Sequence, residues 1–63
     1  MTFIQAKDYA KKGIKITHKY FTNNEYITMK GEMVVFEDGF RINANEWVKG
    51  RKELLDDWSL YIV

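Results

Sequence analysis

The sequence predicts an α+β fold: an N-terminal helix packed on a small, mainly antiparallel sheet of four to five strands, with a short helical turn before the last strand. Two observations lead to this prediction. Apolar residues near the beginning of the chain recur at helical spacing, and after Gly13 the period changes to two. Turn residues then separate several short alternating segments. The 63 residues are expected to form one domain, residues 1–63.

The helix is expected to begin near residue 3. Thr2 and Gln5 have the spacing of a capping box, in which each side chain satisfies a free backbone N–H group of the first turn. Lys11 and Lys12 fall in the last turn, where cations complement the helix dipole, and Gly13 suits the left-handed exit. The apolar positions at helical spacing are Phe3, Ala6, Tyr9 and Ala10.

A half-buried strand is expected from residue 14 onward, followed by a turn at 22–25 and a second strand at 26–30. Gly31-Glu32 fits a two-residue hairpin turn that leads into a third strand at 33–36. In the first of these strands one face carries Ile14, Ile16 and His18, and the other carries Lys15, Thr17 and Lys19.

Asp38-Gly39 then predicts a tight turn in which both central residues have positive φ, before a strand at 40–43. Residues 45–48 fit either a strand or a helical turn, and 52–56 fit a short helical turn. A terminal strand at 57–63 is expected to turn one face inward, namely Trp58, Leu60 and Ile62.

So small a domain needs support beyond its core, because a chain of this length buries only about 60% of the surface that its unfolded form exposes. Cys is absent and a lone His18 cannot form a zinc site, so self-association is the remaining supplement. The hydrophobic content of 46% and the ten aromatic residues agree with exposed contact surface. The alternative is a compact monomer with a few exposed rings.

Charge is distributed unevenly along the chain, with a net charge of +1 divided into about +4 for residues 1–30 and −3 for residues 31–63. Interleaved segments of this kind favour complementary surfaces, so nucleic acid is not an expected partner and an acidic mimic of DNA is excluded. No apolar run approaches the roughly 20 residues of a membrane span, and a signal-peptide core is missing. A soluble, cytoplasmic protein without membrane contact is expected.

Catalytic and metal-binding patterns are missing from the sequence. Asp56 and Asp57 point to opposite faces if extended and have no nearby His or Cys partner. Ser59 is the only serine and no nucleophile elbow surrounds it, while the four glycines are too widely spaced for a phosphate loop. We therefore expect that the protein is not an enzyme and that it binds no metal and no cofactor. His18 is expected to be a partly buried, hydrogen-bonded ring.

The segment 15–21 is the strongest candidate for ligand binding. Its basic side chains adjoin aromatic rings, a combination that can pair with phosphates and stack on bases. The alternative is a solvated strand face at Lys15, Thr17 and Lys19, with Tyr20 and Phe21 in the core. Trp47 lies outside the clear periodic segments and could line a pocket or pack in the core.

The two ends of the chain also carry a resemblance to a known family. The closing segment is Leu54-Leu55-Asp56-Asp57-Trp58, and the opening part has a helix, Gly13 and a basic strand that ends in an aromatic residue. Together these features resemble the Thoeris anti-defence sponge proteins, which are very small phage-borne domains. The resemblance spans nearly the whole chain. Leu54, Leu55 and Trp58 would be hydrophobic anchors of this closing motif, and Asp57 would satisfy backbone N–H groups or contact ligand.

The resemblance implies a phage-encoded anti-defence protein that sequesters a cyclic ADP-ribose-type or cyclic nucleotide immune signal without turnover, as a dimer or tetramer in the cytoplasm of the infected bacterial cell. Phe21 stands where the family has a ligand-gripping Trp, and Thr17 and His18 stand where it often has Arg. Phe keeps a stacking face but lacks the indole N–H, and the change from Arg removes a bidentate phosphate donor.

Under this interpretation Lys19 faces phosphate, and Phe21 with Tyr20 or Trp47 encloses a base. The expected ligand-binding residues are Thr17, Lys19, Tyr20, Phe21, Trp47 and Asp57. The alternative function is a phage host-takeover protein that binds and inhibits a host protein through its exposed aromatic side chains.

Overall fold

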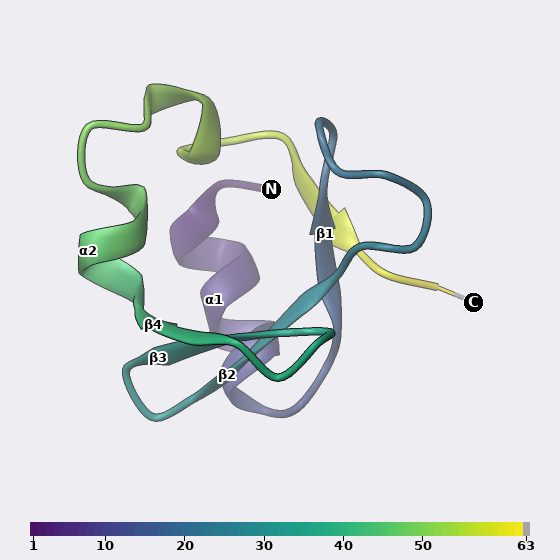
Figure 1. The fold of residues 1–63 in the computed structure, drawn as a ribbon. Helices are drawn as coiled ribbons and strands as arrows, with labels where there is room; N and C mark the ends of the chain where they lie inside the picture. Colours follow the sequence, from purple (N-terminus) through teal and green to yellow (C-terminus); the bar gives the residue numbers. More distant parts are fainter. Residues whose placement is uncertain (63) are drawn as a thin grey trace.

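A computed structural model describes residues 1–62 and has one helix packed on a five-stranded antiparallel sheet (Figure 1). The strands lie in the order β4-β3-β2-β1-β5, and α1 packs against β2, β5 and β1. This arrangement confirms the predicted fold class. The elements are α1 (Phe3–Lys11), β1 (Ile16–His18), β2 (Ile27–Lys30), β3 (Met33–Phe36), β4 (Arg41–Asn43), α2 (Ala44–Val48), the 3₁₀ turn η1 (Lys52–Leu54) and β5 (Trp58–Leu60).

Helix α1 begins at the predicted capping box. The Thr2 Oγ1 accepts a hydrogen bond from the Gln5 N–H at 3.2 Å, and the Gln5 Oε1 accepts one from the Thr2 N–H at 3.0 Å. Gly13 provides the exit with φ of +88°. Phe3, Ala6 and Ala10 are buried as expected, but Tyr9 is exposed, because only the narrow stripe that faces the sheet is covered. No helix within residues 1–62 is long and apolar enough to cross a membrane.

The first of the two predicted hairpin turns has the expected form and the second does not. Lys30 pairs with Met33 across the two-residue turn Gly31-Glu32, as predicted. The β3–β4 turn is longer, because Phe36 and Phe40 close a three-residue loop in which Gly39 has φ of +91°. Asp38 keeps a negative φ, so the prediction of two positive φ angles was wrong. Its carboxylate accepts the Phe40 N–H at 2.9 Å instead.

Residues 45–48, which fitted either a strand or a helical turn, belong to helix α2. Asn43 ends β4 and caps α2, because its Oδ1 accepts hydrogen bonds from the Asn45 and Glu46 N–H groups at 2.9 and 3.3 Å. Gly50 then reverses the chain with φ of +72°. The helical turn expected at 52–56 is shorter and ends at Leu54.

The alternation of apolar residues overstated how far the core extends at both ends of the sheet. Ile14 precedes β1 and is exposed, although the pattern put it on the buried face. At the other end, Leu60 and Ile62 are exposed, with Ile62 at 87%. A nine-residue helix is only about 14 Å long, so α1 cannot cover every inward position of five strands. Strand β5 ends at Leu60, and Val63 lies outside the described residues.

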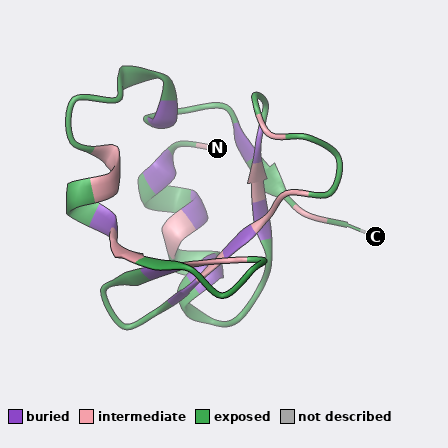
Figure 2. Ribbon diagram, viewed as in Figure 1, coloured by how far each residue is buried: buried purple, intermediate pink, exposed green. Residues whose placement is uncertain are grey.

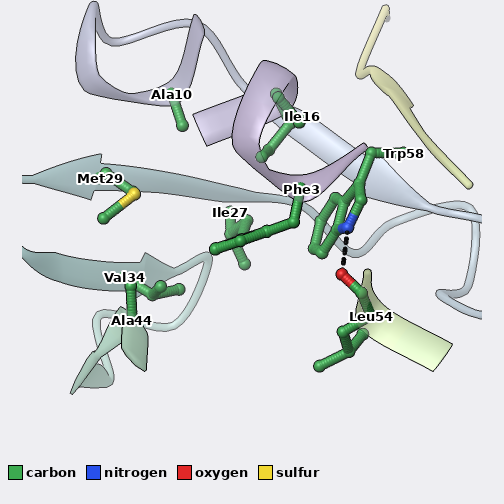
Figure 3. Close-up of a cluster of buried hydrophobic side chains, with 10 residues drawn as sticks. Phe3, Ala10, Ile16, Ile27, Met29, Val34, Ala44, Leu54 and Trp58 are labelled. Carbon is green, nitrogen blue, oxygen red and sulfur yellow. Dashed lines mark hydrogen bonds between the residues drawn. The ribbon is translucent and has the colours of Figure 1, made fainter. Parts of the chain in front are cut away.

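Trp58 belongs to the buried cluster and is 2% exposed. Its indole N–H donates to the Leu54 carbonyl at 2.8 Å, and the Phe3 ring lies 5.5 Å from the Trp58 ring (Figure 3). Figure 2 shows that the buried positions come from α1, the inner strands, the edge strand β5, α2 and η1 together. Of the three predicted anchors in the closing motif, Leu54 and Trp58 are buried, but Leu55 is 56% exposed. Leu55 contributes its carbonyl instead, which accepts the Phe3 N–H at 3.0 Å.

We predict that Trp58→Phe lowers the free energy of unfolding by about 1 to 3 kcal/mol, because the Leu54 carbonyl loses its hydrogen-bond donor inside the core. That loss is large for a domain of this size, whose core rarely supplies more than about 3 to 5 kcal/mol. Urea denaturation followed by circular dichroism measures it. Ile62→Ala is the matched control at an exposed position and should change stability by no more than about 0.5 kcal/mol. Equal stability of Trp58→Phe and the parent protein would contradict the contribution of this buried hydrogen bond.

Candidate functional site

An open hollow of about 450 Å³ lies beside the end of β1 and contains three of the predicted site residues: Thr17, Lys19 and Phe21. It lies between the loop that follows β1 and the segment that follows β5, which run on the same side of the molecule (Figure 1). Most side chains of its wall are exposed, so solvent reaches the hollow freely. The other residues that line it are His18, Thr22, Asn23, Leu60, Tyr61 and Ile62.

The loop that forms one wall is held by hydrogen bonds within itself and to β1. The Phe21 N–H donates to the His18 carbonyl at 2.9 Å, which turns the chain as soon as β1 ends. The Thr22 N–H donates to the Glu25 carboxylate at 2.7 Å, and the Thr17 hydroxyl donates to the Glu25 carbonyl at 2.9 Å. These bonds fix the position of Thr17 and Phe21 relative to each other.

His18 connects this loop to the segment before β5. The ring is 3% exposed and both of its nitrogens have partners: Nε2 lies 2.8 Å from the Asp56 carbonyl, and Nδ1 lies 3.1 Å from the Tyr20 backbone nitrogen. A carbonyl can only accept and an N–H can only donate, so the neutral ring carries its proton on Nε2. His18 is therefore a buried, hydrogen-bonded residue, as the sequence predicted, and joins the β1 loop to the segment before β5.

Phe21 and Trp47 belong to one aromatic cluster but do not face a common space. The Phe21 ring lies 5.6 Å from Trp58 and 6.4 Å from Trp47, whose plane is inclined to it by 47°. Trp47 packs against Phe36 at 5.3 Å and Phe3 at 6.5 Å, and it is not part of the wall of the hollow. A planar base cannot lie flat between Phe21 and Trp47, so the partly buried Trp47 packs beside Phe21 without lining the hollow.

Lys19 lines the hollow and forms an exposed group with Asp57 and Tyr20, which do not line it. The Lys19 ammonium lies 3.9 Å from the Asp57 carboxylate and 5.3 Å from the centre of the Tyr20 ring, which is 67% exposed. Among residues 1–62, Asp57 is the one non-glycine with positive φ, at +70°, and its carbonyl accepts the Lys19 N–H at 3.1 Å. An exposed ion pair contributes at most about 1 kcal/mol, so the ammonium can turn toward an anionic ligand at small cost.

The hollow contains one aromatic residue that the sequence did not single out. Tyr61 lies in its wall, and its backbone N–H donates to the Lys15 carbonyl at 2.9 Å, which continues the β1–β5 pairing by one residue. The only signal in the sequence was the alternation that put Tyr61 on the opposite face from Trp58. Tyr20, by contrast, is not part of the wall.

A second hollow of about 450 Å³ runs along α1 and is lined by Met1, Gln5, Asp8, Tyr9 and Lys12. None of the predicted site residues borders it. Within the described part of the chain, no three His, Asp or Glu side chains gather as metal ligands would.

Comparison with known proteins gave no match to a protein family, to a curated protein or to a solved structure.

The role of His18 leads to a second prediction. His18→Phe keeps an aromatic ring but leaves the Asp56 carbonyl and the Tyr20 N–H without partners, so stability should fall by about 1 to 3 kcal/mol. The Tyr20 amide should also exchange faster with solvent in a hydrogen-exchange experiment. Tyr20→Ala is the control, because it removes an exposed ring and keeps the N–H. In the parent protein, imidazole ¹⁵N shifts should report the Nε2–H tautomer, and the Nδ1–H tautomer would contradict this assignment.

Proposed function

We propose that this protein is a phage-encoded anti-defence protein that captures a cyclic ADP-ribose-type or cyclic nucleotide immune signal stoichiometrically, without turnover. Two independent lines support the proposal. The opening and closing segments resemble the Thoeris anti-defence sponge proteins, and Phe21 stands at the position of their ligand-gripping aromatic. The observation that carries most weight is that Thr17, Lys19 and Phe21, which the sequence had put forward, border one hollow.

The chemistry of these three side chains suits a nucleotide. Phe21 offers a ring for stacking on a base, and Lys19 offers an ammonium for a phosphate. The Thr17 hydroxyl already donates to the Glu25 carbonyl, so its oxygen is left to accept a hydrogen bond from a ribose hydroxyl or a base N–H. Capture without turnover agrees with the state of His18, whose ring nitrogens are both engaged in structural hydrogen bonds.

The volume and openness of the hollow favour an assembly of several copies. A volume of about 450 Å³ lies within the roughly 300–1,000 Å³ that is common for ligand sites, but such sites bury most of the ligand surface. The exposed rim at Lys19, Asn23 and Ile62 would leave one side of a bound nucleotide in water. A second subunit that covers this rim would complete the site, so we propose a dimer or tetramer.

A second candidate function is inhibition of a host protein by direct binding. The observation that favours it is the number of large apolar side chains at the surface, which include Phe40 at 59% exposure on the β3–β4 turn. Exposed aromatic side chains of this kind are typical anchors of protein interfaces. The other exposed large apolar side chains are Ile4, Tyr9, Ile14, Tyr20, Met33, Leu55, Leu60 and Ile62.

Native mass spectrometry of the purified protein, mixed with a panel of cyclic nucleotides and cyclic ADP-ribose isomers, tests the proposal directly. We expect a dimer or tetramer that retains one panel member. Phe21→Leu should reduce retention by about 5- to 150-fold, the loss that corresponds to one base–aromatic stack. Phe40→Ala is the matched control, because it removes an exposed aromatic outside the hollow, and it should retain ligand as the parent does.

Circular dichroism must show that both variants are folded. Retention of no panel member by the folded parent protein would refute nucleotide capture. Co-purification of a host protein whose binding is lost in Phe40→Ala would then support the second candidate.

A further inference from the structure

We infer that Tyr61 supplies a second stacking surface of the ligand site, in addition to Phe21, and that Tyr26 and Lys15 are positioning residues for it. The inference rests on the proposed function and deepens it by assigning the residues that would bind the base. It also replaces the partners that the sequence suggested for Phe21, because neither the partly buried Trp47, which packs against Phe36, nor Tyr20 is part of the wall.

Tyr61 is placed by the register of the sheet. Ile16 pairs with Leu60 on one side and with Ile27 on the other, so β1 lies between the segments that carry Tyr61 and Tyr26. The two rings come together with centroids 4.9 Å apart and planes inclined by 40°. Ile16 is buried against the α1 side, and the alternation of side chains puts Tyr26 and Tyr61 on the opposite face. The pair therefore lies over β1 on the face that α1 does not cover.

Lys15 contacts Tyr26, the member of this pair that does not line the hollow. The Lys15 ammonium lies 4.5 Å from the centre of the Tyr26 ring, within the range of a cation–π contact. Lys15 also anchors Tyr61 directly, because its carbonyl accepts the Tyr61 N–H at 2.9 Å. Of the two tyrosines only Tyr61 lines the hollow, so Lys15 and Tyr26 act through Tyr61 and limit the orientations of its ring.

The charge of the sheet favours an anionic ligand at this place. The five strands contain Lys30 and Arg41 and no acidic residue, and Lys15 and Lys19 flank β1 on either side. Arg41 aligns with Val35 and Thr28 across the sheet, so its side chain is on the face of the tyrosine pair, but β4 is the opposite edge of the sheet from β5. A nucleotide would thus stack its base on Tyr61 while its phosphates pair with Lys19, whose ammonium would leave its exposed ion pair with Asp57.

Isothermal titration with two probes tests the inference: cyclic ADP-ribose and 3′,5′-cyclic AMP. The parent protein should bind at least one of them. Tyr61→Leu should weaken that binding by about 5- to 150-fold, the range for loss of one base–aromatic stack, and Tyr61→Phe should restore it. Ribose 5-phosphate, which has no base, should bind equally to the parent and to Tyr61→Leu. Circular dichroism must show that each variant is folded, as expected for a residue beyond the end of β5.

The positioning role has its own readout. Tyr26→Leu should weaken probe binding less than Tyr61→Leu does and should shift the Tyr61 ring proton resonances in NMR spectra, whereas Tyr26→Phe should restore both.

Two outcomes would overturn the inference in different ways. Binding that Phe21→Leu weakens and Tyr61→Leu leaves unchanged would overturn the role of Tyr61 and keep nucleotide capture. Failure of the folded parent to bind either probe would overturn the inference, and failure across the whole nucleotide panel would overturn nucleotide capture with it.

Discussion

Trp58 joins the parts of this domain that are farthest apart in sequence. Its indole N–H reaches back to Leu54, its ring packs on Phe3, and its backbone exchanges two hydrogen bonds with Met1, at 2.7 and 3.0 Å. The same residue pairs with His18 across β1 and β5. A core this small has few other large side chains at its centre, so helix α1, the turn η1 and the sheet all depend on contacts that involve one tryptophan.

Contacts with Trp58 position the residues of the candidate site. The His18 ring lies 5.0 Å from the Trp58 ring and turns its two nitrogens to the Asp56 carbonyl and the Tyr20 N–H. Phe21 packs edge-on against Trp58 as well, at 86°. The wall of the hollow is therefore an extension of the core, and this explains how a loop rich in exposed polar residues can keep a defined shape.

The sequence predicted the features that depend on residues close together along the chain. It missed those that depend on residues far apart along the chain. The capping box at Thr2 and Gln5 and the Gly31-Glu32 turn depend on neighbours within a few residues, and both are present. Leu60 and Ile62 were expected to be buried because alternation alone cannot report how long the covering helix is. Three of six site residues line one hollow, whereas Tyr61 was missed because its position depends on pairing with β1 from the other end of the chain.

The order of the strands has a consequence for how the domain is made. Strands β2, β3 and β4 follow one another as hairpins, whereas β5 must find β1 after most of the chain has passed between them. Closing so long a loop costs entropy before any contact rewards it, so this pairing is expected to form late in folding. One wall of the hollow, the segment that follows β5, depends on that pairing. On a ribosome, the nascent chain would carry the β2, β3 and β4 hairpins before it carried β5, and the hollow would form only after β5 had been synthesised.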